Sequence, residues 1–150
     1  MKAKKLYLVL LIGLLLIVGC GKKEEEKFDG KIISFSYSYS STKGIYRDYK
    51  IQSNNQDTEI YSYGNDTTTY NVKKNVDKKY IEELEKIVEK YKVKEWNGFN
   101  KQEDVDEGLS FSLEIGFTDG KNLYATGFEI YPEGYEDFQN EFINLFNSIE

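Results

Sequence analysis

The sequence predicts an α+β fold, in which one antiparallel sheet of about six strands carries two helices on one face, in the order ββββαββα. Three observations lead to this prediction. Residues 31–73 alternate between apolar and polar side chains, which is the period of half-buried strands. Residues 78–93 change to a spacing of three or four, which is the period of a helix. Residues 109–149 then repeat the change from alternation to helical spacing.

The first half of the domain reads as four strands joined by turns. They are predicted at residues 31–39, 45–52, 58–63 and 67–73, between runs of serine, asparagine, aspartate and glycine. In the first strand, apolar and aromatic side chains alternate with serines, so the serine side is expected to face away from the core. The apolar set is Ile33, Phe35, Tyr37 and Tyr39.

A helix is predicted over residues 78–93, where one apolar stripe repeats every three or four residues. The stripe consists of Ile81, Leu84, Val88 and Tyr91. Asp77 is placed to cap the first turn, because its carboxylate can accept an unpaired backbone N–H. Trp96 and Phe99 follow the helix, and we expect them to close its end against the core.

The second half of the domain reads as a hairpin followed by a helix. Residues 109–117 alternate and lead into Asp119-Gly120, a pair typical of a two-residue type I′ loop. The pairs that this loop predicts are Ile115 with Tyr124, Leu113 with Thr126 and Phe111 with Phe128. The final helix carries one apolar stripe, which consists of Tyr135, Phe138, Phe142, Leu145 and Ile149.

Residues 1–19 have the composition of a signal peptide. Lys2, Lys4 and Lys5 precede an apolar run from Leu6 to Val18, and uncharged sequence continues only as far as Gly21. This run is shorter than the ~20 apolar residues of a membrane-spanning helix and suits the apolar part of a secretory signal.

The end of this leader, Ile17-Val18-Gly19-Cys20, resembles the lipobox of bacterial lipoproteins. The resemblance implies that a diacylglycerol is attached to the Cys20 sulfur and that the leader is cut just before this cysteine. It divides the chain into a signal peptide (1–19), the lipidated cysteine with a flexible tether (20–28) and a single α+β domain (29–150). The lipid on Cys20 would then hold the protein on the extracytoplasmic face of the cell membrane.

The charge of the exported part excludes one class of partner. Without the three lysines of the leader, the chain from Cys20 onward carries 17 basic and 26 acidic residues, a net charge of −9. A net-acidic protein repels phosphate backbones and anionic headgroups. We therefore expect no nucleic-acid partner, and we expect the lipid to be the contact with the membrane.

Several catalytic and metal sites are excluded or unsupported. Histidine is absent and Cys20 is the only cysteine, which excludes Ser–His–Asp catalysis and imidazole-ligated zinc. Ser40-Ser-Thr-Lys43 matches the serine–lysine pattern of penicillin-recognising enzymes, but it lies in a predicted turn. Glu103-Asp-Val-Asp-Glu107 offers oxygen ligands for Ca²⁺, yet it lacks the EF-hand spacing and is typical of a solvated loop. We therefore expect no catalytic residue, metal or cofactor.

The tyrosines of the first strands are the candidate binding residues. Tyr46 is adjacent to Ile45 and so points to the opposite face, and Tyr61 and Tyr63 alternate with Ile60 in the same way. If Ile45 and Ile60 mark the core side, Tyr46, Tyr61 and Tyr63 lie on the far face. Tyrosine provides rigid contact area with a polar tip, which suits a protein or sugar ligand, although it also fills half-buried strand faces.

About a third of the chain, within residues 96–142, is similar to uncharacterised lipoproteins of low-GC bacteria. The matching features are Trp96-Asn-Gly-Phe99, Ser110-Phe-Ser-Leu113, Asp119-Gly120, Ala125-Thr-Gly127 and Tyr131-Pro132. This resemblance implies no known activity. The sequence therefore favours a non-enzymatic binding lipoprotein that recognises an envelope protein or an extracellular ligand. Two alternatives stay open: an inhibitor or immunity protein against a basic secreted enzyme or toxin, and a hydrolase that uses paired carboxylates.

Overall fold

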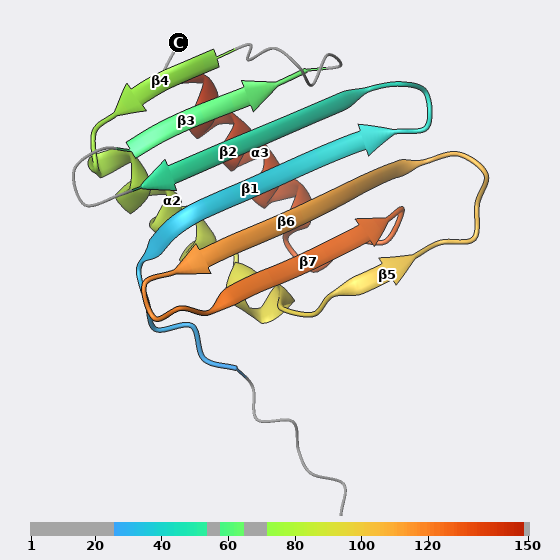
Figure 1. The fold of residues 1–150 in the computed structure, drawn as a ribbon. Coiled ribbons are helices and arrows are strands. Elements are labelled where there is room, and N and C mark those ends of the chain that lie inside the picture. Colours follow the sequence, from blue (N-terminus) through green and yellow to red (C-terminus); the bar gives the residue numbers. More distant parts are fainter. Residues whose placement is uncertain (1–25, 54–57, 65–71, 149–150) are drawn as a thin grey trace, which may run out of the picture.

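Seven strands form one sheet in the computed structural model, which describes residues 26–53, 58–64 and 72–148 (Figure 1). The strands are β1 (Ile32–Ser41), β2 (Tyr46–Ser53), β3 (Thr58–Tyr63), β4 (Val72–Val76), β5 (Asn100–Gln102), β6 (Leu109–Phe117) and β7 (Asn122–Phe128). The helices are α2 (Lys79–Lys90), the short 3₁₀ helix η1 (Val93–Trp96) and α3 (Tyr135–Asn147).

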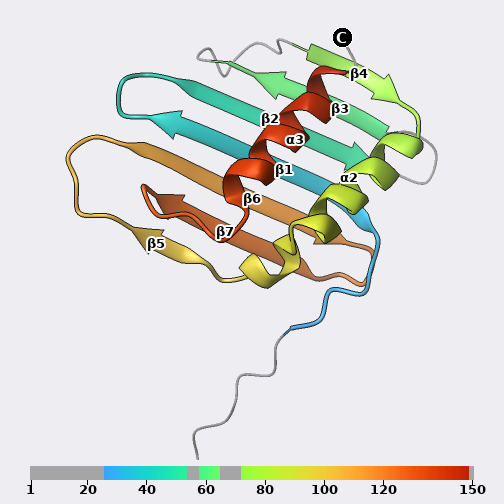
Figure 2. The same cartoon turned by 180° about the vertical axis from the view of Figure 1, so that it is seen from behind.

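The strand order is β4-β3-β2-β1-β6-β7-β5, and α2 and α3 both lie on one face of the sheet (Figure 2). The structure therefore confirms the α+β class and the helices on one face. The prediction of about six antiparallel strands was low by one, because β5 adds a parallel partner to β7 and makes the sheet mixed. All three β5 residues are exposed, so no alternation marks them in the sequence.

A β-bulge at the start of β1 changes which isoleucine enters the core. The pairing of β1 with β6 shifts between Ile32 and Ser34, so the alternation slips by one residue there. Ile32 is consequently buried, whereas Ile33 is 41% exposed. The prediction that Ile33 shares the core face with Phe35 and Tyr37 was wrong for this reason.

Helix α2 begins where the carboxylate of Asp77 accepts the N–H of Lys79 at 2.8 Å, as its predicted capping role requires. The helix ends at Lys90, three residues before the predicted end, and Lys92 then adopts a left-handed conformation with φ of 52°. The chain continues as η1, which buries Trp96 against the ring of Phe138 with 5.1 Å between centroids. The predicted closing role of Trp96 is thus confirmed.

Aromatic rings form the core between the sheet and α3. Phe142 lies 4.8 Å from Phe35 and 5.5 Å from Tyr49, measured between ring centroids. Phe146 lies 4.8 Å from Tyr49 and is more buried than Leu145, which the sequence had placed on the core stripe. The predicted Ile149 lies outside the described residues.

The β6–β7 hairpin has a three-residue loop rather than the predicted two-residue one. The N–H of Phe117 donates to the carbonyl of Lys121, and Gly120 occupies the left-handed region with φ of 80°. The register therefore shifts by one residue from the prediction. The observed pairs are Ile115 with Leu123, Leu113 with Ala125 and Phe111 with Gly127. This shift turns Tyr124 away from the core, where it is 51% exposed.

Two predicted boundaries also move. The fourth strand was predicted over residues 67–73, but β4 spans Val72–Val76, and residues 65–71 lie outside the described residues. Phe28, which the sequence placed in the tether, is buried and packs on Phe117 with 5.1 Å between ring centroids. The folded part of the chain thus includes the last residue of the predicted tether.

Candidate binding surface on the open sheet face

The candidate site lies on the face of the sheet that the helices leave open. Figure 1 looks onto this face, and Figure 2 shows α2 and α3 crossing the other one. Because Phe35 and Tyr37 enter the core, the serines that alternate with them point to the open face. A face without helices exposes whatever side chains the strands carry there, and these decide what it can bind.

A stripe of serines occupies the middle of this open face. It is formed by neighbouring residues of β1 and β6, where Ser38 pairs with Ser112 and Ser40 with Ser110. The hydroxyls of Ser40 and Ser110 share a hydrogen bond of 2.7 Å. Serine side chains are short, so the centre of the face is flat and rich in hydroxyl groups. The serine stripe consists of Ser34, Ser36, Ser38, Ser40, Ser110 and Ser112.

The three predicted tyrosines lie together beside this stripe. In the β1–β2–β3 register, Tyr46 is opposite Ser40, Tyr63 is opposite Asp48 and Tyr61 is opposite Lys50. These positions all belong to the open face, so their predicted placement is confirmed, while their role in binding stays a prediction. Ile45 was a poor marker of the core side, because it precedes β2 and is 49% exposed.

Charged side chains of β2 and β3 contact these tyrosines. The ammonium of Lys50 lies 3.0 Å from Asp48 Oδ2 and 5.3 Å from the centroid of the Tyr63 ring. The hydroxyl of Tyr61 donates to Glu59 at 2.5 Å. Burial raises the pKa of the Tyr46 hydroxyl, and the Asp48 carboxylate beside it raises this pKa further. We refer to Tyr46, Asp48, Lys50, Tyr61 and Tyr63 together as the tyrosine patch.

Asp48 is the unusual member of the tyrosine patch. It is only 7% exposed, although it lies on the open face of the sheet. Its Oδ2 is paired with Lys50, but within the described residues its Oδ1 has no hydrogen-bond partner. A buried polar atom without a partner costs about 1–3 kcal/mol, more if charged. The structure therefore retains an acceptor that the fold itself does not satisfy.

Sequence reasoning missed Asp48 and Lys50, although a signal for them was present. Both occupy positions of β2 that alternate with the core residues Tyr49 and Ile51. The alternation of residues 45–52 predicts that they share a face with Tyr46, and the structure confirms this placement, but the prediction of binding residues was limited to the tyrosines. What the pattern could not show is the cross-strand contact with β3, which encloses the Asp48 carboxylate.

The other candidate sites of the sequence are not assembled. The Ser40 hydroxyl bonds to Ser110, while Lys43 pairs with Glu107 at 3.0 Å, so the serine–lysine pattern does not form a catalytic pair. Residues 103–107 are exposed, and no three acidic or cysteine side chains converge as a metal site anywhere in the described part of the chain. A cavity of about 550 Å³ lies beside α2, but the carboxylate of Glu85 in it already accepts the N–H of Ile32 at 2.9 Å.

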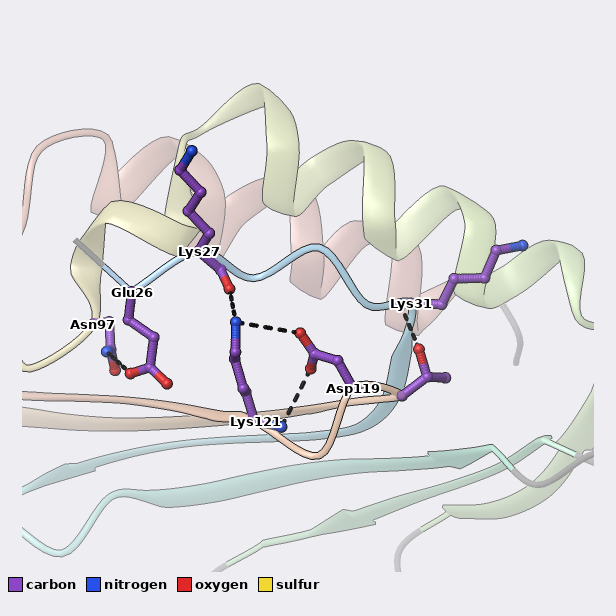
Figure 3. A network of polar contacts seen from close by, with 7 residues as sticks. Glu26, Lys27, Lys31, Asn97, Asp119 and Lys121 are labelled. Carbon is purple, nitrogen blue, oxygen red and sulfur yellow. Dashed lines mark hydrogen bonds and ion pairs between the residues drawn. The ribbon is translucent and has the colours of Figure 1, made fainter. Parts of the chain in front are cut away.

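The segment before β1 is clasped to one end of the sheet (Figure 3). Lys121 Nζ donates to the carbonyl of Lys27 and lies 3.6 Å from Asp119. The amide of Asn97 donates to Glu26 at 3.3 Å. Lys31 exchanges two hydrogen bonds with Thr118, of 2.9 and 3.0 Å. We call this set the tether clasp, and its members are Glu26, Lys27, Lys31, Asn97, Thr118, Asp119 and Lys121.

The tether clasp determines where the chain leaves the folded domain. Figure 1 shows the exit on the side of β7 and β5, whereas the tyrosine patch belongs to β2 and β3. The central strand β1 separates the two regions. A ligand on the tyrosine patch would therefore not meet the described residues 26–28 of the tether.

Cys20 and the leader lie outside the described residues. None of the helices in the described part is both long and apolar enough to cross a membrane. No family model, curated protein or solved structure matches this chain.

Proposed function

We propose that this protein is a non-enzymatic lipoprotein, anchored through Cys20 on the extracytoplasmic face of the cell membrane, which recognises another protein through its open sheet face. The observation that carries the proposal is the tyrosine patch: three half-buried tyrosines on the one face that no helix covers. Tyrosine is enriched in protein interfaces because a rigid ring with a polar tip loses little entropy on binding.

The size of the open face supports a protein partner. Its strands average about seven residues and lie about 4.8 Å apart, which gives roughly 23 by 29 Å, or about 700 Å². Specific protein interfaces bury about 800 Å² on each partner. The open face is therefore close to the size of one ordinary interface, with aromatic anchors at one side and hydroxyl groups in the middle.

The position of the tether supports presentation of this face to a partner. Five residues separate Cys20 from Glu26, and a chain of that length spans at most about 20 Å. The tether clasp holds the described end of this link, residues 26–31, on the side of β7 and β5. The tyrosine patch, on the other side of β1, is then accessible to a partner in the envelope.

Site-specific photo-cross-linking in cells tests which face binds. A photoreactive phenylalanine analogue is placed at Tyr46, Tyr61 or Tyr63 of the full-length chain, and at Glu82 on the exposed side of α2 as the control. We expect one dominant protein adduct from the tyrosine positions and none from Glu82. Adducts of equal yield from both faces, or no adduct from the tyrosines, would overturn the proposal.

A second experiment separates recognition from folding. Tyr46, Tyr61 and Tyr63 are replaced together by serine, and the matched control replaces by serine Tyr124 of β7, which is exposed on the same open face but lies outside the tyrosine patch. We expect the triple variant to lose the adduct formed from a position next to the patch, while its circular dichroism spectrum is unchanged. Binding that survives the triple substitution would remove the tyrosines from the proposed surface.

The anchor is tested independently through Cys20. A Cys20→Ser variant lacks the sulfur that would carry the lipid, so we expect it to lose metabolic labelling with palmitate and to leave the membrane fraction. The full-length wild-type chain is the control. Labelling or membrane retention that persists in the variant would refute lipid anchoring through this residue.

A further inference from the structure

We propose that Asp48 receives an arginine side chain from the partner protein, whose guanidinium takes the place that the Lys50 ammonium now occupies. This inference rests on the proposed function, because it names the chemistry that the tyrosine patch recognises. It begins from the buried carboxylate of Asp48, whose Oδ1 has no hydrogen-bond partner within the described residues.

The ion pair with Lys50 uses only one oxygen of this carboxylate, to which the Tyr46 hydroxyl also hydrogen-bonds. Lys50 reaches Oδ2 alone, at 3.0 Å, as expected of an ammonium that acts as a point charge. A guanidinium is planar and presents parallel N–H groups, so it can bond both oxygens of a carboxylate at once. Replacement of the ammonium by a guanidinium would therefore satisfy Oδ1 without loss of the contact to Oδ2.

Lys50 is positioned so that it can be displaced. Its side chain is 43% exposed, so water can solvate the ammonium when it leaves, although the Asp48 carboxylate itself is buried. The released ammonium can return to solvent without leaving another group unpaired. Asp48 cannot do the same, because β2 and its neighbours hold it in the sheet.

The surroundings of Asp48 suit a cation with a flat face. The Lys50 ammonium already lies 5.3 Å from the Tyr63 ring, so a positive charge is favoured at this place. Guanidinium groups also stack on aromatic rings. Across from Asp48 on β1 lies Ser38, whose side chain is short.

The overall charge of the exported chain favours the same class of partner. Its net charge of −9 would attract a basic protein over distance and increase the rate of encounter. A surface that attracts basic proteins and holds an unsatisfied carboxylate points to a partner with an exposed arginine. A neutral ligand, such as a glycan, could donate a hydroxyl group to this carboxylate but would gain nothing from the net charge.

The test uses a charged probe and its neutral counterpart. The full chain, isolated from membranes in detergent micelles and labelled with ¹⁵N, is titrated with N-acetylarginine amide and then with N-acetylcitrulline amide, which has nearly the same shape but no charge. Binding is read from the amide shifts of residues 46–50 and 61–63. We expect the arginine probe to bind at least about tenfold more tightly, which corresponds to about 1.4 kcal/mol.

Three variants make the test specific. Asp48→Asn keeps the size of the side chain, and we expect it to weaken arginine binding to the level of the citrulline probe. Lys50→Gln removes the competing ammonium, and we expect it to tighten arginine binding about threefold or more. Glu114→Gln removes an exposed carboxylate on the same face of β6, and we expect it to change binding less than twofold.

The outcomes distinguish this inference from the proposed function. Equal binding of the two probes, or weaker binding after Lys50→Gln, would overturn the arginine site even if Asp48→Asn failed to fold. If the tyrosine positions still cross-link to a partner in that case, the open face binds a protein by other chemistry. If cross-linking is lost as well, the proposed function fails with it.

Discussion

Removal of one hydroxyl from the core should destabilise the protein measurably. Tyr37 is fully buried, and its hydroxyl shares a hydrogen bond of 2.7 Å with Tyr135 and accepts one of 2.6 Å from the Gln139 amide. Tyr37→Phe keeps the ring but takes the shorter hydrogen bond from two groups at once, which leaves Tyr135 and Gln139 only the 3.5 Å contact with each other. A buried polar group without its partner costs about 1–3 kcal/mol, so we expect a loss of about 2 kcal/mol in the free energy of unfolding.

The neighbouring substitution provides the matched control. Tyr135→Phe leaves the Tyr37 hydroxyl bonded to Gln139, so we expect the smaller loss of about 1 kcal/mol. The free energy of unfolding of the double variant should be little lower than that of Tyr37→Phe alone, because the two hydroxyls belong to one hydrogen-bond network.

Urea unfolding of the three variants, followed by circular dichroism, measures these differences. A loss of about 2 kcal/mol lowers the midpoint by roughly 1 M when the slope is about 2 kcal/mol/M. A slope equal to that of wild type shows that only stability has changed. If Tyr37→Phe costs no more than Tyr135→Phe, or if the two losses simply add, the network does not carry the stability assigned to it here.

Three further predictions concern the same unfolding free energy. Ile32→Ser should cost about 2–3 kcal/mol and Ile33→Ser less than about 0.5, because the bulge buries only the first; equal losses would contradict the bulge. Gly127→Ala should cost about 1–3 kcal/mol, since an added Cβ would overlap a carbonyl oxygen of the following loop, and a neutral effect in a thermal melt would argue against that packing. Burial raises the pKa of Tyr37 above its ordinary value and that of Tyr49 to about 12. Unfolded tyrosines ionise near pH 10, so urea midpoints should be constant below pH 10 and fall as the pH rises toward 12 and beyond; a midpoint that stays level there would refute the assignment.

The periodicity of the sequence predicted the fold class, but it did not predict the register of β1 with β6 or that of β6 with β7. Alternation located β1 and β6, yet it could not show the bulge that exchanges Ile32 for Ile33, because a bulge depends on the partner strand. Asp119-Gly120 suits both a two-residue loop and a three-residue loop with glycine in the left-handed region. The longer loop places Leu123 in the core instead of Tyr124. The packing of the core, and not the turn residues, therefore determines the loop length.

The candidate site was predictable only in outline. Alternation against Ile60 placed Tyr61 and Tyr63 on the open face, as the structure confirms. An isolated aspartate in a strand, however, reads as a solvated residue. Only the pairing with β3, and the position of Lys50, show that Asp48 is enclosed.

The tether clasp also sets the path of mechanical load through the domain. Residue 26 leads within six residues into β1, which is the central strand and is hydrogen-bonded to β2 on one side and β6 on the other. A pull between the membrane and a partner on β2 and β3 would therefore act on β1 along its length. Rows of backbone hydrogen bonds would then be sheared together instead of being opened one at a time. Attachment at this strand, rather than at the edge strands β4 or β5, would make the sheet resistant to forces transmitted by the proposed anchor.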